Sequence, residues 1–232
     1  MNRYAWDLRY PPPDAIQHTY PISALYERTH AEPQGPFVVP GKYEVRVTVD
    51  GKTYRQPLTV EMDPRVKVTQ AALQQQLDFA QKVGSLVSLS YSFHEQAAKF
   101  QSEVADRQAA LEKNGHANAA TQATKDFAAK VLKIQGEMQR GFGGGGKPKP
   151  TFTLMNSELA YLSGVVSQAD AAPTDAMHTA YHDYCQDLTK LAQQWSDLMK
   201  QVLPAVNAQL TEQHLQPLPE TMLTGTVPAC GQ

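Results

Sequence analysis

The chain has 232 residues, of which 41% are hydrophobic and 19% charged, a composition ordinary for one large or two small globular domains. Its formal net charge of −2 gives no field that would hold nucleic acid or an anionic membrane. No stretch approaches the roughly 20 apolar residues of a membrane span, and residues 1–13 lack the apolar core of a signal peptide. We therefore expect no nucleic-acid partner, no membrane span and no signal peptide in this chain.

Large apolar or aromatic side chains alternate with charged residues and an alanine over residues 3–10. Tyr4, Trp6, Leu8 and Tyr10 occupy every second position, which is typical of one face of a β-strand. Pro11 ends the predicted strand, because proline cannot donate to a ladder. We expect these four residues to lie in the core of a small sheet or to contact a partner. The alternative is an aromatic surface on which a sugar could stack.

A β-hairpin is predicted over residues 43–60. Alternate apolar residues run from Tyr43 to Val49, and Asp50-Gly51 is the strongest short signal for a two-residue hairpin turn. The return strand, residues 52–60, contains Pro57, which favours a sheet edge or a bulge. Together with residues 3–10, the hairpin predicts a partial antiparallel β-sandwich over residues 1–63.

The period changes from two to 3.6 near Asp63-Pro64, and residues 64–220 predict an antiparallel four-helix bundle. Thr69 is a candidate N-cap for a first helix that ends near residue 114. The other helices are expected at about 118–139, 154–169 and 174–211, with a kink at Pro204. The Gly/Pro-rich residues 141–150 predict a linker, and residues 221–232 a flexible tail. The predicted fold class is therefore α+β.

Two segments could carry chemistry. Residues 141–147 nearly spell a phosphate-binding loop, but this segment follows a helix, and Pro148 stands where the magnesium-binding hydroxyl is needed. We therefore interpret it as a linker and expect no cofactor. His178, His182 and Cys185 share one helical face with a spacing that zinc could use, but no further ligands complete the set. We expect solvated or interface residues there, and no metal.

No pair of carboxylates and no G-x-S-x-G motif indicates a catalytic site, so we expect that this chain is not an enzyme. The two cysteines, Cys185 and Cys230, are too few for a disulfide scaffold. Free thiols are the simpler interpretation, and a bridge formed by a tail that folds back is the alternative.

Several segments resemble the C-terminal region of bacterial sortilin-like, BNR-repeat β-propeller proteins, which are often labelled glycosyl hydrolase or photosystem II assembly-factor-like. The segments that carry the resemblance are residues 2–10 (NRYAWDLRY), 35–36 (GP), 39–47 (VPGKYEVRV), 50–52 (DGK), 63–65 (DPR), 206–210 (VNAQL) and 217–218 (PL).

The resemblance implies that the strands form the second half of an immunoglobulin-like sandwich in a longer, periplasmic or secreted parent protein. Its partners would be the upstream propeller and sandwich strands, with self-association through the exposed sheet edge when these are missing. The propeller and the first sandwich strands are absent from this sequence, so we expect Met1 to be an internal methionine. The implied function is a non-catalytic accessory and interaction module. The alternative is the C-terminal part of a glycan-acting hydrolase whose chemistry lies upstream.

Overall fold

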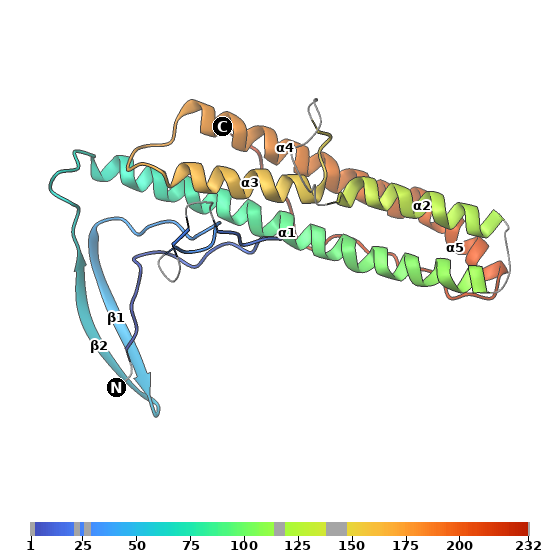
Figure 1. The fold of residues 1–232 in the computed structure, drawn as a ribbon, viewed down its shortest axis with the longest axis horizontal. Coiled ribbons are helices and arrows are strands. Elements are labelled where there is room, and N and C mark those ends of the chain that lie inside the picture. Colours follow the sequence, from blue (N-terminus) through green and yellow to red (C-terminus); the bar gives the residue numbers. More distant parts are fainter. Residues whose placement is uncertain (1–2, 21–23, 26–28, 114–118, 138–147, 232) are drawn as a thin grey trace.

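The fold is mixed α+β and mostly helical, with a β-hairpin that projects from one end of an elongated group of helices (Figure 1). The computed structural model describes residues 3–20, 24–25, 29–113, 119–137 and 148–231. The phosphate-loop-like residues 141–147 therefore lie outside the described residues. No helix in the described part of the chain is both long and apolar enough to cross a membrane.

The predicted hairpin is confirmed. Strands β1 (Gly41–Val49) and β2 (Lys52–Val60) pair antiparallel, with Val49 opposite Lys52 and Gly41 opposite Val60. Asp50 and Gly51 both have positive φ, 48° and 76°, which is the backbone geometry of a type I′ turn. This turn twists in the same sense as the strands, so the two-residue loop fixes the register in which β1 and β2 pair.

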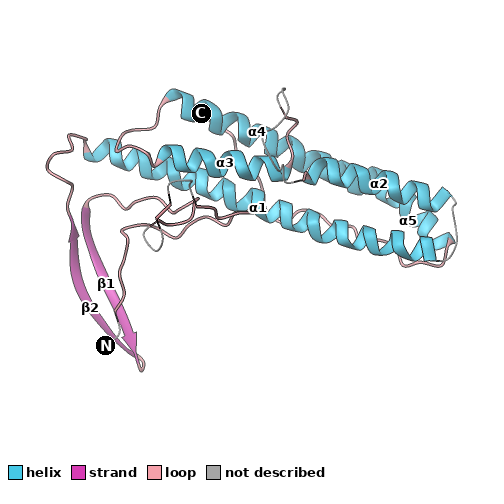
Figure 2. Cartoon of the chain, viewed as in Figure 1, coloured by secondary structure: helices cyan, strands magenta, loops and turns pink. Residues whose placement is uncertain are grey.

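The prediction of a strand over residues 3–10 is wrong. These residues form an extended segment with one isolated bridge, Arg9 opposite Phe37. Leu8 has φ of 63°, outside the extended region, so the extended conformation is interrupted within the predicted strand. The sheet in the described residues consequently has two strands rather than the three or four of a sandwich half (Figure 2).

Three helices follow the hairpin close to their predicted positions. Helix α1 spans Gln70–Lys113, and the Thr69 hydroxyl caps it by accepting a hydrogen bond from the Ala72 N–H at 3.1 Å. Helix α2 spans Ala119–Gln135 and ends at Gly136, whose φ of 81° suits the left-handed position after a helix. Helix α3 spans Phe152–Val166 behind its N-cap Thr151.

The last helical segment is continuous but contains one π-helical turn between two α-helical parts. Helix α4 (Asp175–Asp197) is capped by Thr174, runs into a π-helical turn, η1 (Leu198–Val202), and continues as α5 (Leu203–Glu212). The predicted disturbance at Pro204 takes this form. Proline has no N–H to donate and its ring crowds the carbonyl four residues back, and the wider π turn just before it accommodates both effects.

The helices pack around an aromatic core. Helix α1 contacts α2 and α3 along its length, and α4 packs on α3. The ring of Trp195 on α4 lies 5.6 Å from that of Phe100 on α1 and 6.3 Å from that of Phe152 on α3, measured between centroids. Five large rings of this core are almost completely buried: Phe93, Phe100, Phe127, Phe152 and Trp195.

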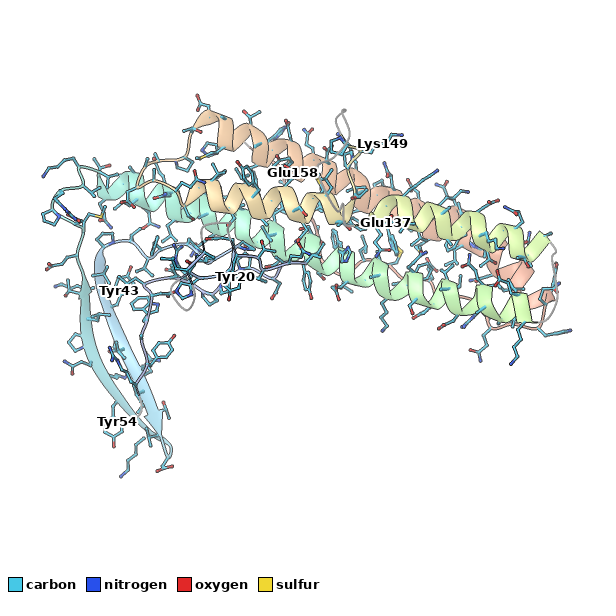
Figure 3. All side chains as sticks on the ribbon, viewed as in Figure 1. Tyr20, Tyr43, Tyr54, Glu137, Lys149 and Glu158 are labelled. Carbon is cyan, nitrogen blue, oxygen red and sulfur yellow. A yellow bond between two sulfur atoms is a disulfide. The ribbon has the colours of Figure 1, made fainter. Side chains whose placement is uncertain are left out.

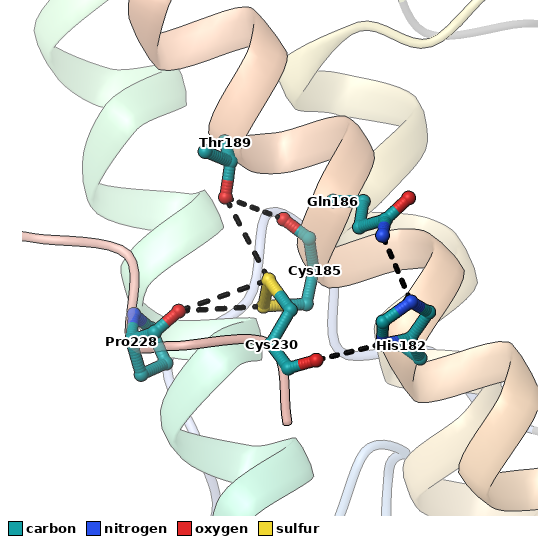
Figure 4. The surroundings of a disulfide bond; sticks show 6 residues. All are labelled: His182, Cys185, Gln186, Thr189, Pro228 and Cys230. Carbon is teal, nitrogen blue, oxygen red and sulfur yellow. Dashed lines mark hydrogen bonds between the residues drawn. A yellow bond between two sulfur atoms is a disulfide. The ribbon is translucent and has the colours of Figure 1, made fainter. Parts of the chain in front are cut away.

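The C-terminal residues, expected to form a flexible tail, instead lie against the helices as far as Cys230. Cys230 forms a disulfide with Cys185 of α4, so the interpretation of the two cysteines as free thiols is wrong (Figure 4). Upstream of the bridge, the Gln96 side chain of α1 accepts hydrogen bonds from the N–H and the hydroxyl of Thr224. Asn207 both donates to and accepts from the backbone of Leu218, at 2.8 Å each.

Candidate functional site

One side of the hairpin is an exposed apolar surface. Because side chains alternate along a strand and the register sets Val47 opposite Tyr54, the apolar residues of both strands share one face. The apolar members of this hairpin face are Tyr43, Val45, Val47, Val49, Tyr54 and Leu58, and the polar residues Lys52 and Gln56 lie among them. Figure 3 shows these strands standing away from the helices, with Tyr54 near the tip.

The hairpin face is largely open to solvent. The exposed fraction is 50% for Val47, 54% for Val49 and 61% for Tyr54. Single exposed apolar residues are common on protein surfaces, but a contiguous patch of this kind indicates an interaction site. A two-stranded sheet is also marginal by itself in water, so a covering partner would stabilise it.

The structure only partly unites the four predicted contact residues with this surface. Trp6 packs edge-on against Tyr43, with ring centroids 6.0 Å apart, and its indole N–H donates to the carbonyl of Arg9. Tyr4 is 88% exposed, and Leu8 and Tyr10 are each 38% exposed. The sequence pattern did not indicate that the valines of β1 are exposed, because alternation predicts a shared face without showing what covers it.

The base of the hairpin is fixed to the N-terminal segment. The Arg9 guanidinium stacks 3.5 Å from the centre of the Phe37 ring and donates to the carbonyl of Gly35 at 2.7 Å. Burial lowers the pKa of Arg9, and the charges of Glu32 and Asp7 oppose that shift. A cavity of about 400 Å³ lies between this base and α1. The hairpin is therefore anchored at one end and free at the other.

The opposite face of the hairpin is polar. The Glu44 carboxylate accepts from Arg46 at 3.2 Å and from Arg55 on the neighbouring strand at 3.1 Å. All three side chains are substantially exposed, so these ion pairs contribute little to folding. They do fix the arrangement of charge along β1.

The predicted zinc-spaced residues have other partners. The His178 ring packs in a tilted orientation against Phe79, with centroids 4.5 Å apart. His182 Nδ1 lies 2.6 Å from the carbonyl oxygen of Cys230, and Cys185 is bonded to the Cys230 sulfur. In the part of the chain that the structure describes, no group of three His, Cys, Asp or Glu side chains is placed to hold a metal ion.

A buried polar group joins the N-terminal segment to the helices. Asn156 of α3 is 2% exposed, donates to the carbonyl of Val87 and the hydroxyl of Ser90, and accepts from the N–H of Ile16. Nearby, burial lowers the pKa of His94, and the charge of Glu95 opposes that shift. The Thr153 hydroxyl lies 3.1 Å from His94 Nδ1 and bonds the carbonyls that end α2. The Asn156 contact holds the N-terminal segment on the helices, whereas the Thr153 hydroxyl joins the start of α3 to α1 and to the end of α2.

Comparison with known proteins finds no matching family model, no matching curated protein and no matching solved structure. The resemblance to sortilin-like, BNR-repeat proteins therefore stays a hypothesis. Function has to be inferred from the surface that the fold leaves open.

Proposed function

We propose that this chain is a non-catalytic interaction module, and that the hairpin face is its binding surface. The observation that carries the proposal is the run of exposed apolar side chains on both strands, from Val45 at 45% exposed to Tyr54 at 61%. Burial of that surface by a partner would be favourable at about 25 cal/mol per Å². The rigid base and projecting tip suit a sheet that another polypeptide completes.

The resemblance supports a specific partner. We propose that the chain is the C-terminal part of a larger exported β-propeller protein, in which upstream strands cover the hairpin face and complete an immunoglobulin-like sandwich. The helices would then form a four-helix bundle beside it. The Cys185–Cys230 disulfide supports a periplasmic or secreted location, because such bonds persist in oxidising compartments.

Two substitutions at adjacent positions test the binding surface. Val47→Lys places a charge on the hairpin face, whereas Thr48→Lys places the same charge on the polar face of the same strand. We expect Val47→Lys to abolish binding of the upstream strands, supplied as a separate polypeptide from the parent gene, and Thr48→Lys to leave it unchanged. Isothermal titration calorimetry measures both. Equal affinities for the two variants would show that the hairpin face is not the binding surface.

The non-catalytic part of the proposal has its own measurement. The purified chain is expected to hydrolyse no model glycoside and to contain no stoichiometric zinc by elemental analysis. Turnover that one carboxylate substitution abolishes would instead support a glycan-acting hydrolase with chemistry in this chain. About one zinc ion per chain, lost in the variant that carries both His178→Ala and His182→Ala, would instead support a metal site at these residues.

A further inference from the structure

The two edges of the hairpin differ in their capacity to accept another strand. The type I′ turn makes Val49 and Lys52 a hydrogen-bonded pair, so hydrogen-bonded and non-hydrogen-bonded pairs alternate from there. Pro57, opposite Glu44, falls in a non-hydrogen-bonded pair, and its missing N–H therefore belongs to the outer edge of β2. Proline on an edge blocks strand addition, so the β2 edge is closed.

The outer edge of β1 has no such block. By the same alternation, the backbone N–H and C=O groups of Lys42, Glu44, Arg46 and Thr48 point away from β2. The N-terminal segment lies near this strand through the Trp6–Tyr43 contact. Over the residues that the structure places, however, no backbone hydrogen bond joins residues 3–7 to β1. This edge is a row of unpaired groups on an element that projects from the helices (Figure 1).

We propose that the β1 edge pairs antiparallel with the β1 edge of a second copy of this chain, about a two-fold axis at Val45. This inference rests on the proposed function, since it uses the same sheet as an interface. The occupant follows from charge complementarity. A two-fold axis at Val45 sets Glu44 of each copy opposite Arg46 of the other, in hydrogen-bonded pairs that satisfy the outward backbone groups.

The neighbouring symmetric registers fail the same charge criterion. An axis at Glu44 would set the two Glu44 carboxylates opposite each other and Arg46 opposite Lys42. An axis at Arg46 would oppose the two Arg46 guanidinium groups. Like charges directly opposite each other destabilise a strand pair. Registers that set an outward-pointing residue opposite an inward-pointing one would leave the outward N–H groups unpaired. A register centred on Tyr43 would also set opposite charges together, Glu44 and Lys42, but it would pair only residues 41–45 of β1. Charge complementarity over the full length of the strand therefore selects the register centred on Val45.

The same register gives the polar face additional opposite-charge neighbours and the hairpin face additional apolar contacts. Within one hairpin, Arg46 stands opposite Arg55, a like-charge pair that Glu44 partly offsets. In the dimer, Arg46 gains Glu44 of the second copy on its other side. On the apolar face, Val45 adjoins Val45 of the second copy, and Tyr43 adjoins Val47 of the second copy. The result is one four-stranded sheet with a continuous hairpin face.

A matched pair of proline substitutions tests the choice of edge. Arg46 and Arg55 are cross-strand partners that bond the same Glu44 carboxylate, and their N–H groups point to opposite edges. We expect the wild-type chain to sediment with twice the monomer mass at high concentration. Arg46→Pro should sediment as a monomer, and Arg55→Pro should remain a dimer. Sedimentation equilibrium over a concentration series measures all three.

A pair of charge reversals tests the register. Glu44→Arg and Arg46→Glu each place like charges opposite each other in the homodimer, so each variant alone should be a monomer. An equimolar mixture of the two restores both opposite-charge pairs and should form a 1:1 heterodimer. The double variant, with both changes in one chain, should form a homodimer. A mixture that stays monomeric would overturn the Val45 register.

Failure of this inference is distinguishable from failure of the proposed function. A wild-type chain that is monomeric at every concentration overturns the dimer, as does slow hydrogen exchange at Glu44 and Arg46 in a monomer, which would show that residues 3–7 occupy the edge. In either case, loss of binding to the upstream strands by Val47→Lys would still support the hairpin face. A dimer that Arg46→Pro does not disrupt would also overturn the inference, because it would use another surface.

Discussion

The indole N–H of Trp195 donates a 2.8 Å hydrogen bond to the backbone carbonyl of Thr221. The same ring is fully buried against Phe100 and Phe152. One side chain therefore fills the centre of the helical core and positions the C-terminal tail. Trp195 therefore stabilises the protein both by packing and by a hydrogen bond, and substitutions can separate these two contributions.

Trp195→Ala should lower the free energy of unfolding by about 3–5 kcal/mol, because it leaves a cavity in a packed aromatic core. Trp195→Phe keeps much of the buried ring and loses the hydrogen bond to Thr221. Its own cost should be smaller, about 1–3 kcal/mol, for the carbonyl left without its partner. Urea denaturation followed by circular dichroism measures both. An unchanged midpoint for Trp195→Ala would show that this ring does not stabilise the fold.

Removing the disulfide should destabilise the protein by about 2–4 kcal/mol, because the bond closes a loop with a sequence separation of 45 and restricts the unfolded chain. The variant carries Cys185→Ala and Cys230→Ala together, so that no free thiol remains. Hydrogen exchange should quicken over residues 222–231 more than in the core of α1. Treatment of the wild-type chain with a reductant is the control, and it should reproduce the same exchange pattern.

Asn156 should hold the N-terminal segment on the helices, and Asn207 should hold the C-terminal segment. Asn156→Ala removes the acceptor for the Ile16 N–H, and Asn207→Ala removes both bonds to Leu218. Each change should cost about 1–3 kcal/mol, because it leaves backbone groups unpaired. Faster exchange is expected near residue 16 in the first variant and near residue 218 in the second. If both variants loosen both segments, the two joints are coupled through the core.

Tyr184 should titrate at unusually high pH. Burial, with a hydrogen bond to Glu158 and the charges of nearby acidic groups, raises the pKa of Tyr184 to about 12. Because the folded pKa lies above the unfolded value, its stabilising effect is complete below about pH 10 and is lost as the pH rises toward 12. Absorbance titration near 295 nm should show a late phenol transition that Tyr184→Phe removes. Glu158→Gln should move it to lower pH, and an unmoved transition would exclude the Glu158 contribution.

Local signals in the sequence predicted the elements that local chemistry decides. Asp50-Gly51 specifies the turn because both residues tolerate positive φ, and Thr69 caps its helix with its own hydroxyl. The fourth predicted helix includes Trp195, and the structure buries this residue in the core.

Features that depend on distant segments could not be predicted in this way. The strand over residues 3–10 needed a neighbour, and alternation does not show that Leu8 leaves the extended region. The pairing of Cys185 with Cys230 depends on a tail that folds back along α4, and nothing in the spacing indicates that path. The exposure of the hairpin face likewise depends on what the rest of the molecule leaves uncovered.

The disulfide also determines how the molecule would bear mechanical load. A pull applied at residue 231 passes through the Cys230 sulfur to Cys185 near the middle of α4. Residues 186–229, which include η1, α5 and the tail, form a closed covalent loop that carries none of this tension. The force would therefore load the packing of α4 on α3 first. The hydrogen bond between Trp195 and Thr221 would carry no load until the disulfide is reduced.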